Sequence, residues 1–213
     1  MRKLYLLVML AIFATGLFIS HSYIVTAGEN RPAVIDGQTL PGPANCSDGW
    51  RITGYFTPVE GDYTSTEMTE INVGRAGKMS FNADFVRVVF DDNKGYGEGW
   101  GKTRFGWYLG NYDGRWHRSD VPLGVDNQPL KPNSVAVDPA LIPADSTVTI
   151  PGLPGEYGKM QFVGNDEGVT VHGKHIDIYT GEGRDARRKM NWVTFEDDDE
   201  LQRVCFSPPV PNS

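Results

Sequence analysis

Polar and apolar residues alternate near the end of the chain, where His175, Ile176, Asp177 and Ile178 follow one another. A period of two residues is typical of a half-buried β-strand, whose isoleucines face a core while Asp177 faces away from it. A rigid strand holds an acid in a defined direction, although most exposed charged residues are simply solvated. The alternation therefore makes Asp177 a candidate catalytic residue. Other residues of the chain have to support that role.

Several other short runs predict strands, and the apolar run 85–90 is the strongest of them. The only stretch that favours a helix is 185–189, and Gly- and Pro-rich turns separate the remaining runs. Many short strands with little helix indicate a closed or nearly closed β-barrel. The predicted strands are 50–58, 81–90, 134–138, 147–150, 160–164, 175–178 and 192–195.

Composition is that of one globular domain: 213 residues, 39% hydrophobic and 22% charged, with 25 Gly and 14 Pro. The net charge of -7 argues against a nucleic-acid partner, which needs a basic face, but does not exclude a polysaccharide. Segment 91–114 is dense in glycine and aromatic residues. Its rings either stand exposed for stacking on sugars or pack beneath long loops, and the sequence leaves both readings open.

The N-terminus has the pattern of a secretory signal peptide over residues 1–27. Arg2 and Lys3 precede an uncharged, mostly apolar run over 4–19, and Val25 to Ala27 resembles a small-residue cleavage site. An uncleaved N-terminal anchor is the alternative, although the apolar run is shorter than the roughly 20 residues that span a bilayer. Both readings predict export to the periplasm or cell envelope. Residues 28–49 are expected to form an extended arm, before a domain over 50–205.

Cys46 and Cys205 lie near opposite ends of the mature chain. In an oxidising compartment a single pair is most simply a disulfide, with two unpaired thiols as the alternative. The sequence has no second cysteine pair and no closely spaced pair, so we expect no zinc site, no other metal site and no redox motif. Residues 206–213 are predicted to be a disordered tail.

Three segments in order resemble the three-aspartate (3D) domain found in membrane-bound lytic transglycosylases and in exported cell-wall proteins. They are Gly54–Pro58, Val135–Pro139 with the following Ile-Pro, and Asp166–Gly181. The family pattern is roughly V-A-V-D-P-x-x-I-P, then D-T-G-G-x-I-K-G-x-x-x-D-x-Y. Asp138, Asp166 and Asp177 fall on its three aspartates. The chain departs from the pattern in the glycine turn, which reads Glu167-Gly168-Val169, and at His172, where the family has lysine.

The resemblance implies a mainly β fold, a six-stranded double-psi β-barrel with long loop insertions. It also implies that Asp177 is the catalytic acid/base and that Asp166 lies beside it. The resemblance covers 50–205, and the chain is expected to be too short for the second domain that forms one wall of the groove in the large transglycosylases. The expected substrate-binding residues are Tyr55, Thr57, Asp138, Gly168, His172, His175 and Tyr179.

The implied activity is that of a peptidoglycan lytic transglycosylase, which cleaves the MurNAc-β-1,4-GlcNAc bond and leaves 1,6-anhydro-MurNAc ends without a cofactor. The expected partners are glycan strands, with a cell-wall hydrolase as a candidate partner, and the chain is expected to be a monomer. One alternative is a non-catalytic peptidoglycan- or polysaccharide-binding barrel. Another is a hydrolytic glycosidase that uses water and two carboxylates.

Overall fold

The computed structural model describes residues 44–91, 97–195, 197 and 200–209, and the backbone of 34–35 and 38–39. All of these belong to one compact unit, Arg31–Ser213. The predicted signal peptide and the last four residues of the predicted tail lie outside the described residues. Within the described part of the chain, no helix combines the length and apolarity that crossing a membrane requires.

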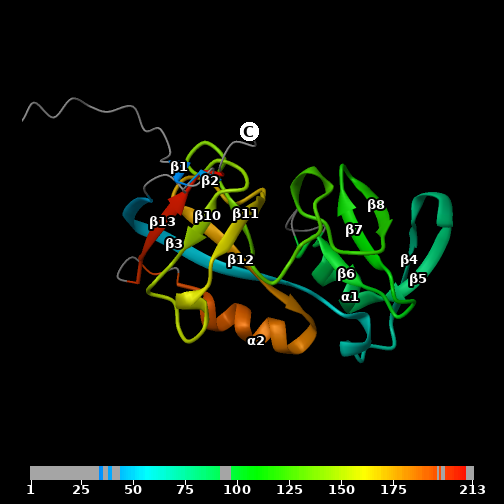
Figure 1. Ribbon diagram of the computed structural model, residues 1–213. Helices are drawn as coiled ribbons and strands as arrows, with labels where there is room; N and C mark the ends of the chain where they lie inside the picture. Colours follow the sequence, from blue (N-terminus) through cyan, green and yellow to red (C-terminus); the bar gives the residue numbers. More distant parts are fainter. Residues whose placement is uncertain are drawn as a thin grey trace, which may run out of the picture. The chain divides into compact units, whose positions relative to one another are not determined.

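Six strands close into a barrel in the order β10-β11-β9-β12-β3-β13 (Figure 1). The β9–β11 and β3–β12 pairs are parallel, and the other neighbours are antiparallel. This confirms the predicted mainly β fold with a closed six-stranded barrel, and the two parallel pairs are consistent with a double-psi crossing. The barrel strands are β3 (Asn45–Thr57), β9 (Ser134–Val137), β10 (Thr147–Thr149), β11 (Phe162–Asp166), β12 (His175–Glu182) and β13 (Gln202–Ser207). A short hairpin of β1 (Val34–Ile35) and β2 (Gln38–Thr39) precedes them.

Alternate residues of the barrel strands fill its interior. Ile176 and Ile178 of β12 pack with Val135 and Val137 of β9 and with Ile52 of β3 in one hydrophobic cluster. Burying each such side chain stabilises the fold by about 1.5–3 kcal/mol. The residues between them point to the outer face of the barrel, which explains why a period-two pattern could place Asp177 before the fold was known.

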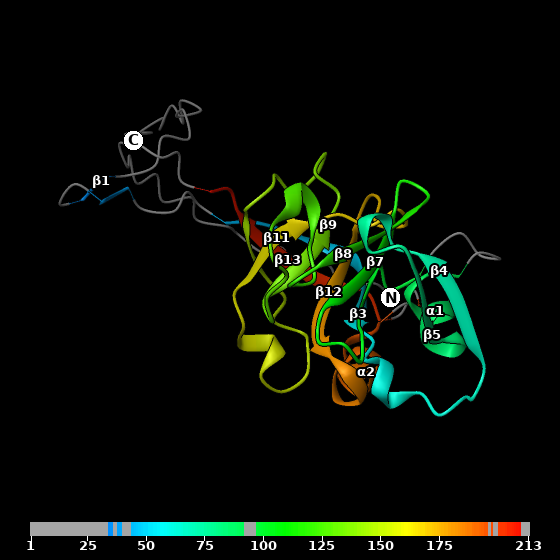
Figure 2. The ribbon, with the colours of Figure 1, turned by 90° about the vertical axis from the view of Figure 1, so that its right-hand side faces the viewer.

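The chain between β3 and β9 builds a second hydrophobic core, which the sequence analysis did not expect. It contains a two-stranded sheet, a helix and a three-stranded sheet (Figure 2). The core is formed by Ile71, Val73, Phe81, Phe85, Val86, Val89, Trp107 and Leu109. The elements are β4 (Met68–Asn72), β5 (Lys78–Asn82), α1 (Ala83–Val89), β6 (Trp100–Lys102), β7 (Tyr108–Tyr112) and β8 (Arg115–Ser119). We refer to residues 58–133 as the insertion; the sequence analysis expected long loop insertions and one strand, 81–90, in this part of the chain.

Four single-turn 3-10 helices occur in the connections of the described chain. They are η1 (Glu60–Asp62), η2 (Gly74–Ala76), η3 (Val125–Asn127) and η4 (Tyr157–Lys159). The first begins the insertion directly after β3, and the third lies beside one of the candidate catalytic acids.

The apolar run 85–90 is helical in α1 and not the predicted strand. Asn82 caps this helix, since its side-chain Oδ1 accepts hydrogen bonds from the backbone N–H groups of Asp84 (3.0 Å) and Phe85 (3.2 Å). Phe85, Val86 and Val89 are buried, at the spacing of one helical face. A short apolar run fits a buried helix as well as a strand, and the cap decides between them.

The other helix, α2 (Gly183–Val193), confirms the predicted helical stretch 185–189 and extends it at both ends. The helix includes two residues of the predicted strand 192–195, so that prediction is wrong. The last residue of the predicted strand, Phe195, forms only an isolated bridge with Ile52. Gly54 allows α2 to pack closely on β3, because a Cβ at that position would lie 2.9 Å from Val193 and 3.0 Å from Met190. The final strand of the barrel is instead β13.

Cys46 and Cys205 form a disulfide, which confirms the predicted pairing. The two residues are direct partners in the register of β3 and β13, so the bond joins the first barrel strand to the last. Because β13 continues to Ser207, the predicted tail begins at least two residues too early.

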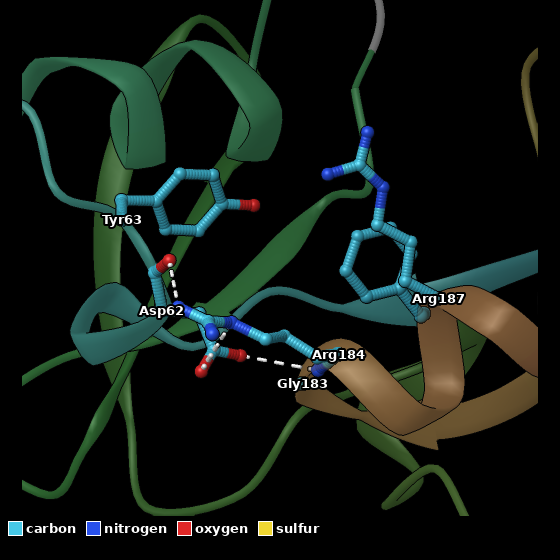
Figure 3. A pocket seen from close by; sticks show the side chains of 6 residues that line it. Asp62, Tyr63, Gly183, Arg184 and Arg187 are labelled. Carbon is cyan, nitrogen blue, oxygen red and sulfur yellow. Dashed lines mark hydrogen bonds and ion pairs between the residues drawn. The ribbon is translucent and has the colours of Figure 1, made fainter.

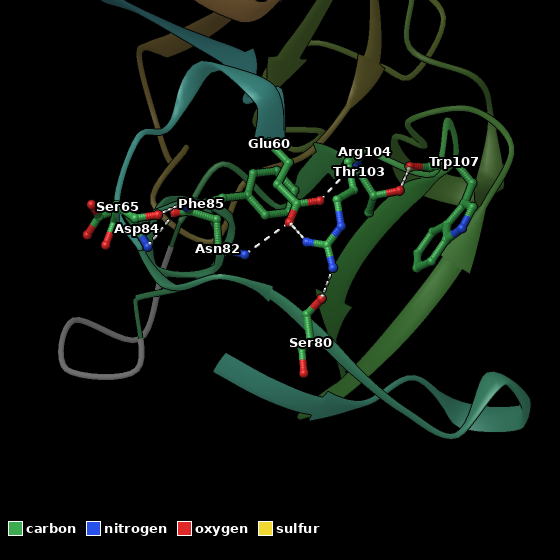
Figure 4. A network of polar contacts seen from close by, with 9 residues as sticks. All are labelled: Glu60, Ser65, Ser80, Asn82, Asp84, Phe85, Thr103, Arg104 and Trp107. Atoms are coloured by element: carbon green, nitrogen blue, oxygen red, sulfur yellow. Dashed lines mark hydrogen bonds and ion pairs between the residues drawn. The ribbon is translucent and has the colours of Figure 1, made fainter. Parts of the chain in front are cut away.

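An ion pair between a buried carboxylate and an exposed arginine organises the insertion. The carboxylate of Glu60, 4% exposed, accepts hydrogen bonds from the backbone N–H groups of Asn82 (3.0 Å) and Arg104 (2.8 Å) and from the Arg104 guanidinium. The same guanidinium also donates to the carbonyl of Ser80 (2.7 Å), as Figure 4 shows. A buried carboxylate needs such partners, and here they join the start of the insertion to β5 and to the β6–β7 turn.

Candidate active site

Two of the three aspartates lie in one row across the barrel. Asp166 pairs with Ala136 on one side, and Asp177 pairs with the same alanine on the other side. Asp177 in turn pairs with Thr53 of β3. Residues paired across a sheet share a face, and neighbouring strands lie about 4.8 Å apart, so the two aspartate Cα atoms are about 10 Å apart. The residue between the two acids in this row is Ala136, whose side chain is small.

The carboxyl of Asp177 is partly exposed and is held by its neighbour in the row. Thr53 Oγ1 donates a hydrogen bond to Asp177 Oδ1 (2.8 Å). The same Oγ1 also lies 2.8 Å from His175 Nε2. Thr53 thus connects the candidate acid to a histidine two residues away on β12.

His175 is 5% exposed, and its predicted contact with substrate stays a prediction. Its Nδ1 lies 3.1 Å from the carbonyl oxygen of Thr170, which can only accept a hydrogen bond. Nη2 of Arg51 lies 3.1 Å from Nδ1 and 3.2 Å from Nε2. A guanidinium can only donate a hydrogen bond, so the ring nitrogen that Arg51 binds acts as the acceptor.

Asp166 is bound by a tyrosine and a loop of the insertion. The Tyr55 hydroxyl donates to Oδ2 (2.6 Å), and the backbone N–H of Val125 donates to Oδ1 (3.1 Å). Burial raises the pKa of the Asp166 carboxyl, and the hydrogen bonds from Tyr55, Glu167 and Val125 partly offset this. Gly124 permits the close approach of the loop, because a Cβ there would lie 3.0 Å from Oδ1 of Asp166.

The Tyr55 hydroxyl remains protonated in this position. Burial, followed by the field and hydrogen bond of Asp166, raises the pKa of Tyr55 well above its usual value. The charge of Asp177 contributes in the same direction, which shows that Tyr55 feels both acids. Tyr55 is therefore a hydrogen-bond donor that links the two carboxyl groups electrostatically.

Glu98 is a carboxyl of this site that the sequence analysis missed. It precedes β6, and its Oε2 accepts a hydrogen bond from the backbone N–H of Phe56 on β3 (3.0 Å). Burial raises the pKa of Glu98 to about 7, and the negative charge of Asp177 contributes; the Phe56 bond and the charge of Arg187 oppose the rise. A glutamate between two glycines has no sequence signal that would separate it from a solvated surface residue.

We expect Glu98 to make the protein less stable as the pH rises. Its carboxyl has a usual pKa of 4.5 and a folded pKa of about 7, so the folded state binds more protons between these values. Its contribution to the free energy of unfolding is therefore fully present below about pH 4.5 and is lost as the pH passes 7. At about 1.4 kcal/mol per pKa unit the loss is about 3 kcal/mol. Urea unfolding of the wild type and Glu98→Gln at pH 5 and pH 8 measures it.

Gln keeps an oxygen that can accept the Phe56 N–H bond, so the variant removes only the titration. Asp166 also titrates and is present in both proteins, which is why the difference between the two pH dependences is the measured quantity. Identical pH dependences for the wild type and the variant would contradict the assignment.

Thr57 and Tyr179 are buried and bind each other, with 2.9 Å between their hydroxyl oxygens. Burial raises the pKa of Tyr179 to about 12, so it keeps its proton. The ring of Tyr179 lies 5.3 Å from that of Tyr55 between centroids. Both residues thus support the tyrosine that holds Asp166, and a direct contact with substrate stays a prediction.

Asp138 connects two loops through hydrogen bonds. Its carboxylate accepts hydrogen bonds from the backbone N–H groups of Gly173 (2.6 Å) and Ala140 (2.9 Å), and the Gly173 bond is the main cause that lowers the pKa of Asp138. The neighbouring His172 is exposed, and Gly168 packs against Val171, where a Cβ would lie 2.8 Å from a side-chain methyl. The substrate contacts predicted for these three residues stay predictions.

Most rings of the segment 91–114 that the structure describes pack inward. Trp100, Trp107 and Tyr108 are buried, whereas Phe105 and Tyr112 are exposed. Packing beneath the insertion therefore accounts for more of these rings than sugar stacking does. Across the described ranges, no three His, Cys, Asp or Glu side chains gather in a way that could hold a metal ion.

A pocket of about 190 Å³ opens between the start of the insertion and α2 (Figure 3). Asp177 does not line it, but Phe56 does, and the backbone N–H of Phe56 binds Glu98, which interacts with Asp177. The pocket is lined by Phe56, Asp62, Tyr63, Gly183, Arg184 and Arg187, and we call it the Arg187 pocket.

Comparison with known families assigns the segment that carries the acids. Residues 133–194 match the family model of the 3D domain, so this part of the chain is a 3D domain and contains Asp138, Asp166 and Asp177. No curated protein matches the chain in sequence.

A solved structure shows the same fold. MltA from Escherichia coli with bound chitohexaose has a TM-score of 0.52 and 17% identity, over 76% of this chain and 72% of that one. The lytic transglycosylase LtgG of Burkholderia pseudomallei has a TM-score of 0.41 and 15% identity, over 83% of this chain and 74% of that one. At these identities the MltA likeness establishes the fold alone, and the weaker LtgG match carries no argument.

Proposed function

We propose that this protein is a lytic transglycosylase that cleaves peptidoglycan glycan strands, with Asp177 as the acid/base. One observation carries the proposal: the chain presents a partly exposed, hydrogen-bonded Asp177 on the outer face of a 3D-domain barrel, with a second acid in the same row. The fold is that of MltA, a protein whose structure was determined with bound chitohexaose. These features support an enzyme that breaks glycosidic bonds.

The proposed reaction needs one carboxyl in two roles. Protonated Asp177 gives its proton to the oxygen that leaves C1 of the muramoyl residue, and the C1–O bond breaks. The 6-hydroxyl of the same sugar then attacks C1, and the ionised Asp177 accepts the hydroxyl proton. The products are a 1,6-anhydro end and a free 4-hydroxyl, and the step consumes no water and no cofactor.

The contacts of Thr53 fix the direction of the candidate acid. Thr53 Oγ1 donates to Asp177 Oδ1 and lies 2.8 Å from His175 Nε2, so Asp177 is held on the outer face of the barrel. The negative charges of Asp177 and Glu98 oppose each other, because the charge of Asp177 contributes to the raised pKa of Glu98.

Asp166 is proposed to orient the sugar or to adjust the field at Asp177. Tyr55 supports this role, because its buried hydroxyl donates a hydrogen bond to Asp166 and its pKa is also raised by the charge of Asp177. The same row of two acids is the observation that favours the hydrolytic alternative, in which the second carboxylate activates a water.

Export to the periplasm or cell envelope is part of the proposal. The disulfide between Cys46 and Cys205 supports an oxidising compartment. A partner hydrolase and a monomeric state stay predictions from the sequence.

The products distinguish the three functions. Purified peptidoglycan incubated with the protein is expected to release muropeptides with 1,6-anhydro ends, which mass spectrometry detects as lighter than hydrolytic products by one water. Reducing ends in their place would identify a hydrolytic glycosidase. Binding without any soluble product would leave the wall-binding barrel.

A further inference from the structure

Arg187 is a cation without a fixed anion at the open side of the Arg187 pocket. It is exposed on α2, and no hydrogen bond or ion pair of its guanidinium occurs within the ranges that the structure describes. It does act electrostatically on two neighbours, since its charge lowers the pKa of both Glu98 and Tyr63 against the larger effect of their burial. The planar guanidinium of an arginine binds a carboxylate through two parallel hydrogen bonds.

The other charged groups of this pocket already satisfy one another. Arg184 Nε lies 3.3 Å from Asp62 Oδ1, and its Nη2 donates to the Asp62 carbonyl (2.7 Å). The backbone N–H of Arg184 donates to Asp62 Oδ2 (3.1 Å), so the aspartate also occupies the N-terminus of α2. Neither Arg184 nor the helix end is therefore left for a ligand, and Arg187 is the group with unused donors.

Tyr63 places a second hydrogen-bond donor beside Arg187. Figure 3 shows the Tyr63 hydroxyl directed toward the Arg187 side chain across the pocket. Burial raises the pKa of Tyr63 to about 12, so the hydroxyl keeps its proton at any physiological pH. The Tyr63 ring is held in place by an edge contact with Phe85 of α1. A neutral hydroxyl and a guanidinium from two different elements thus face one space.

We propose that Arg187 and Tyr63 form a subsite for a carboxylate carried by the glycan substrate. The inference rests on the proposed function, because it takes peptidoglycan as the ligand. A series of contacts links the subsite to Asp177: Phe56 lines the pocket, its backbone N–H donates to Glu98, and the charge of Asp177 acts on Glu98. A carboxylate bound there also adds negative charge near Glu98.

Peptidoglycan offers this carboxylate in two ways. Muramic acid carries a lactyl group whose carboxylate is free only when the stem peptide has been removed. An intact stem peptide consumes that carboxylate in an amide bond but brings carboxylates of its own. Chitooligosaccharides have the same sugar backbone and no carboxylate at all, so they serve as the reference ligand.

The test measures binding in the Asp177→Asn background, where no cleavage is required. Affinity is compared for Asp177→Asn with and without Arg187→Gln or Tyr63→Phe, on four ligands: intact strands, strands stripped by an amidase, stripped strands converted to methylamides, and chitohexaose. We expect Arg187→Gln to weaken carboxylate-bearing strands about tenfold and Tyr63→Phe to weaken them less. Methylamidated strands and chitohexaose should bind equally with and without either change.

A matched control removes a charge elsewhere. Arg75 is exposed in the insertion and does not line the Arg187 pocket, so Arg75→Gln should leave all four affinities unchanged. A loss confined to stripped strands assigns the lactyl carboxylate, and a loss confined to intact strands assigns the stem peptide. Equal loss on chitohexaose, equal loss with Arg75→Gln, or no loss at all would overturn the subsite. The test measures binding without turnover, so it is independent of the proposed reaction. It can be carried out even if the wild-type protein does not cleave peptidoglycan.

Discussion

Asp177→Asn is expected to lower the rate of glycan cleavage by about a hundredfold to ten-thousandfold, the usual contribution of a general acid or base. Asparagine keeps an oxygen that can accept the Thr53 hydrogen bond, so the row of side chains on the barrel should stay in place. It has no proton of suitable acidity for the leaving oxygen and cannot accept one afterwards. The release of anhydro-muropeptides from purified peptidoglycan, followed by mass spectrometry, measures the effect.

Two measurements separate lost chemistry from lost structure. The variant should still bind peptidoglycan and unfold at the wild-type denaturant concentration. Asp145→Asn is the matched control, because Asp145 is exposed and has a φ of 60°, which asparagine tolerates well. It should cleave at the wild-type rate. Wild-type turnover by Asp177→Asn would show that another group, with Asp166 and Glu98 as the nearest candidates, supplies the proton.

Loss of the Cys46–Cys205 disulfide is expected to destabilise the protein by about 5 kcal/mol in the chain-entropy model. The bond closes a loop with a sequence separation of 159, which restricts the unfolded chain strongly. Stabilities of 5–15 kcal/mol are usual, so this is a large share of the total. Urea unfolding of the wild type with and without a reductant measures the difference, and thermal unfolding should fall by about 10–20 °C.

The double variant Cys46→Ser, Cys205→Ser is the control for side effects of the reductant. Cys46 is exposed and Cys205 only partly buried, so little packing is lost with the sulfur atoms. The variant should match the reduced wild type and show no further change when reductant is added. A stability difference below about 1 kcal/mol would contradict this prediction and would mean that residual structure already restricts the unfolded chain.

The elements that the sequence predicted well are those with a strong local pattern. The alternation over 175–178 placed β12 and the outward direction of Asp177, because side chains of a strand alternate between faces wherever the strand pairs. The stretch 134–138 predicted β9 in the same way. The apolar run 85–90 was assigned to the wrong element, since four or five apolar residues satisfy a helix face and a strand equally well.

The residues of the candidate site were likewise predicted only in part. Its acids were found because they sit in a recognisable spacing, but Glu98 was missed, as only folding brings its carboxyl to the Phe56 N–H and near Asp177. His175 was expected to line the groove, and the structure adds that it is buried with its Nε2 2.8 Å from Thr53 Oγ1. Burial of a strand's first residue depends on the loop that covers it, here the carbonyl of Thr170, and no local pattern reports that.

The sequence by itself determined the barrel class, the three aspartates of the 3D domain and the pairing partners of the disulfide, because each follows from local periodicity, residue spacing or a count of two cysteines. Only the tertiary structure decided that Asp166 and Asp177 flank one alanine, that the insertion has its own core and that Arg187 faces an open pocket. These arrangements depend on strand register and burial between distant segments. The free energies of such contacts are set by which residues meet, and residue order alone does not reveal that.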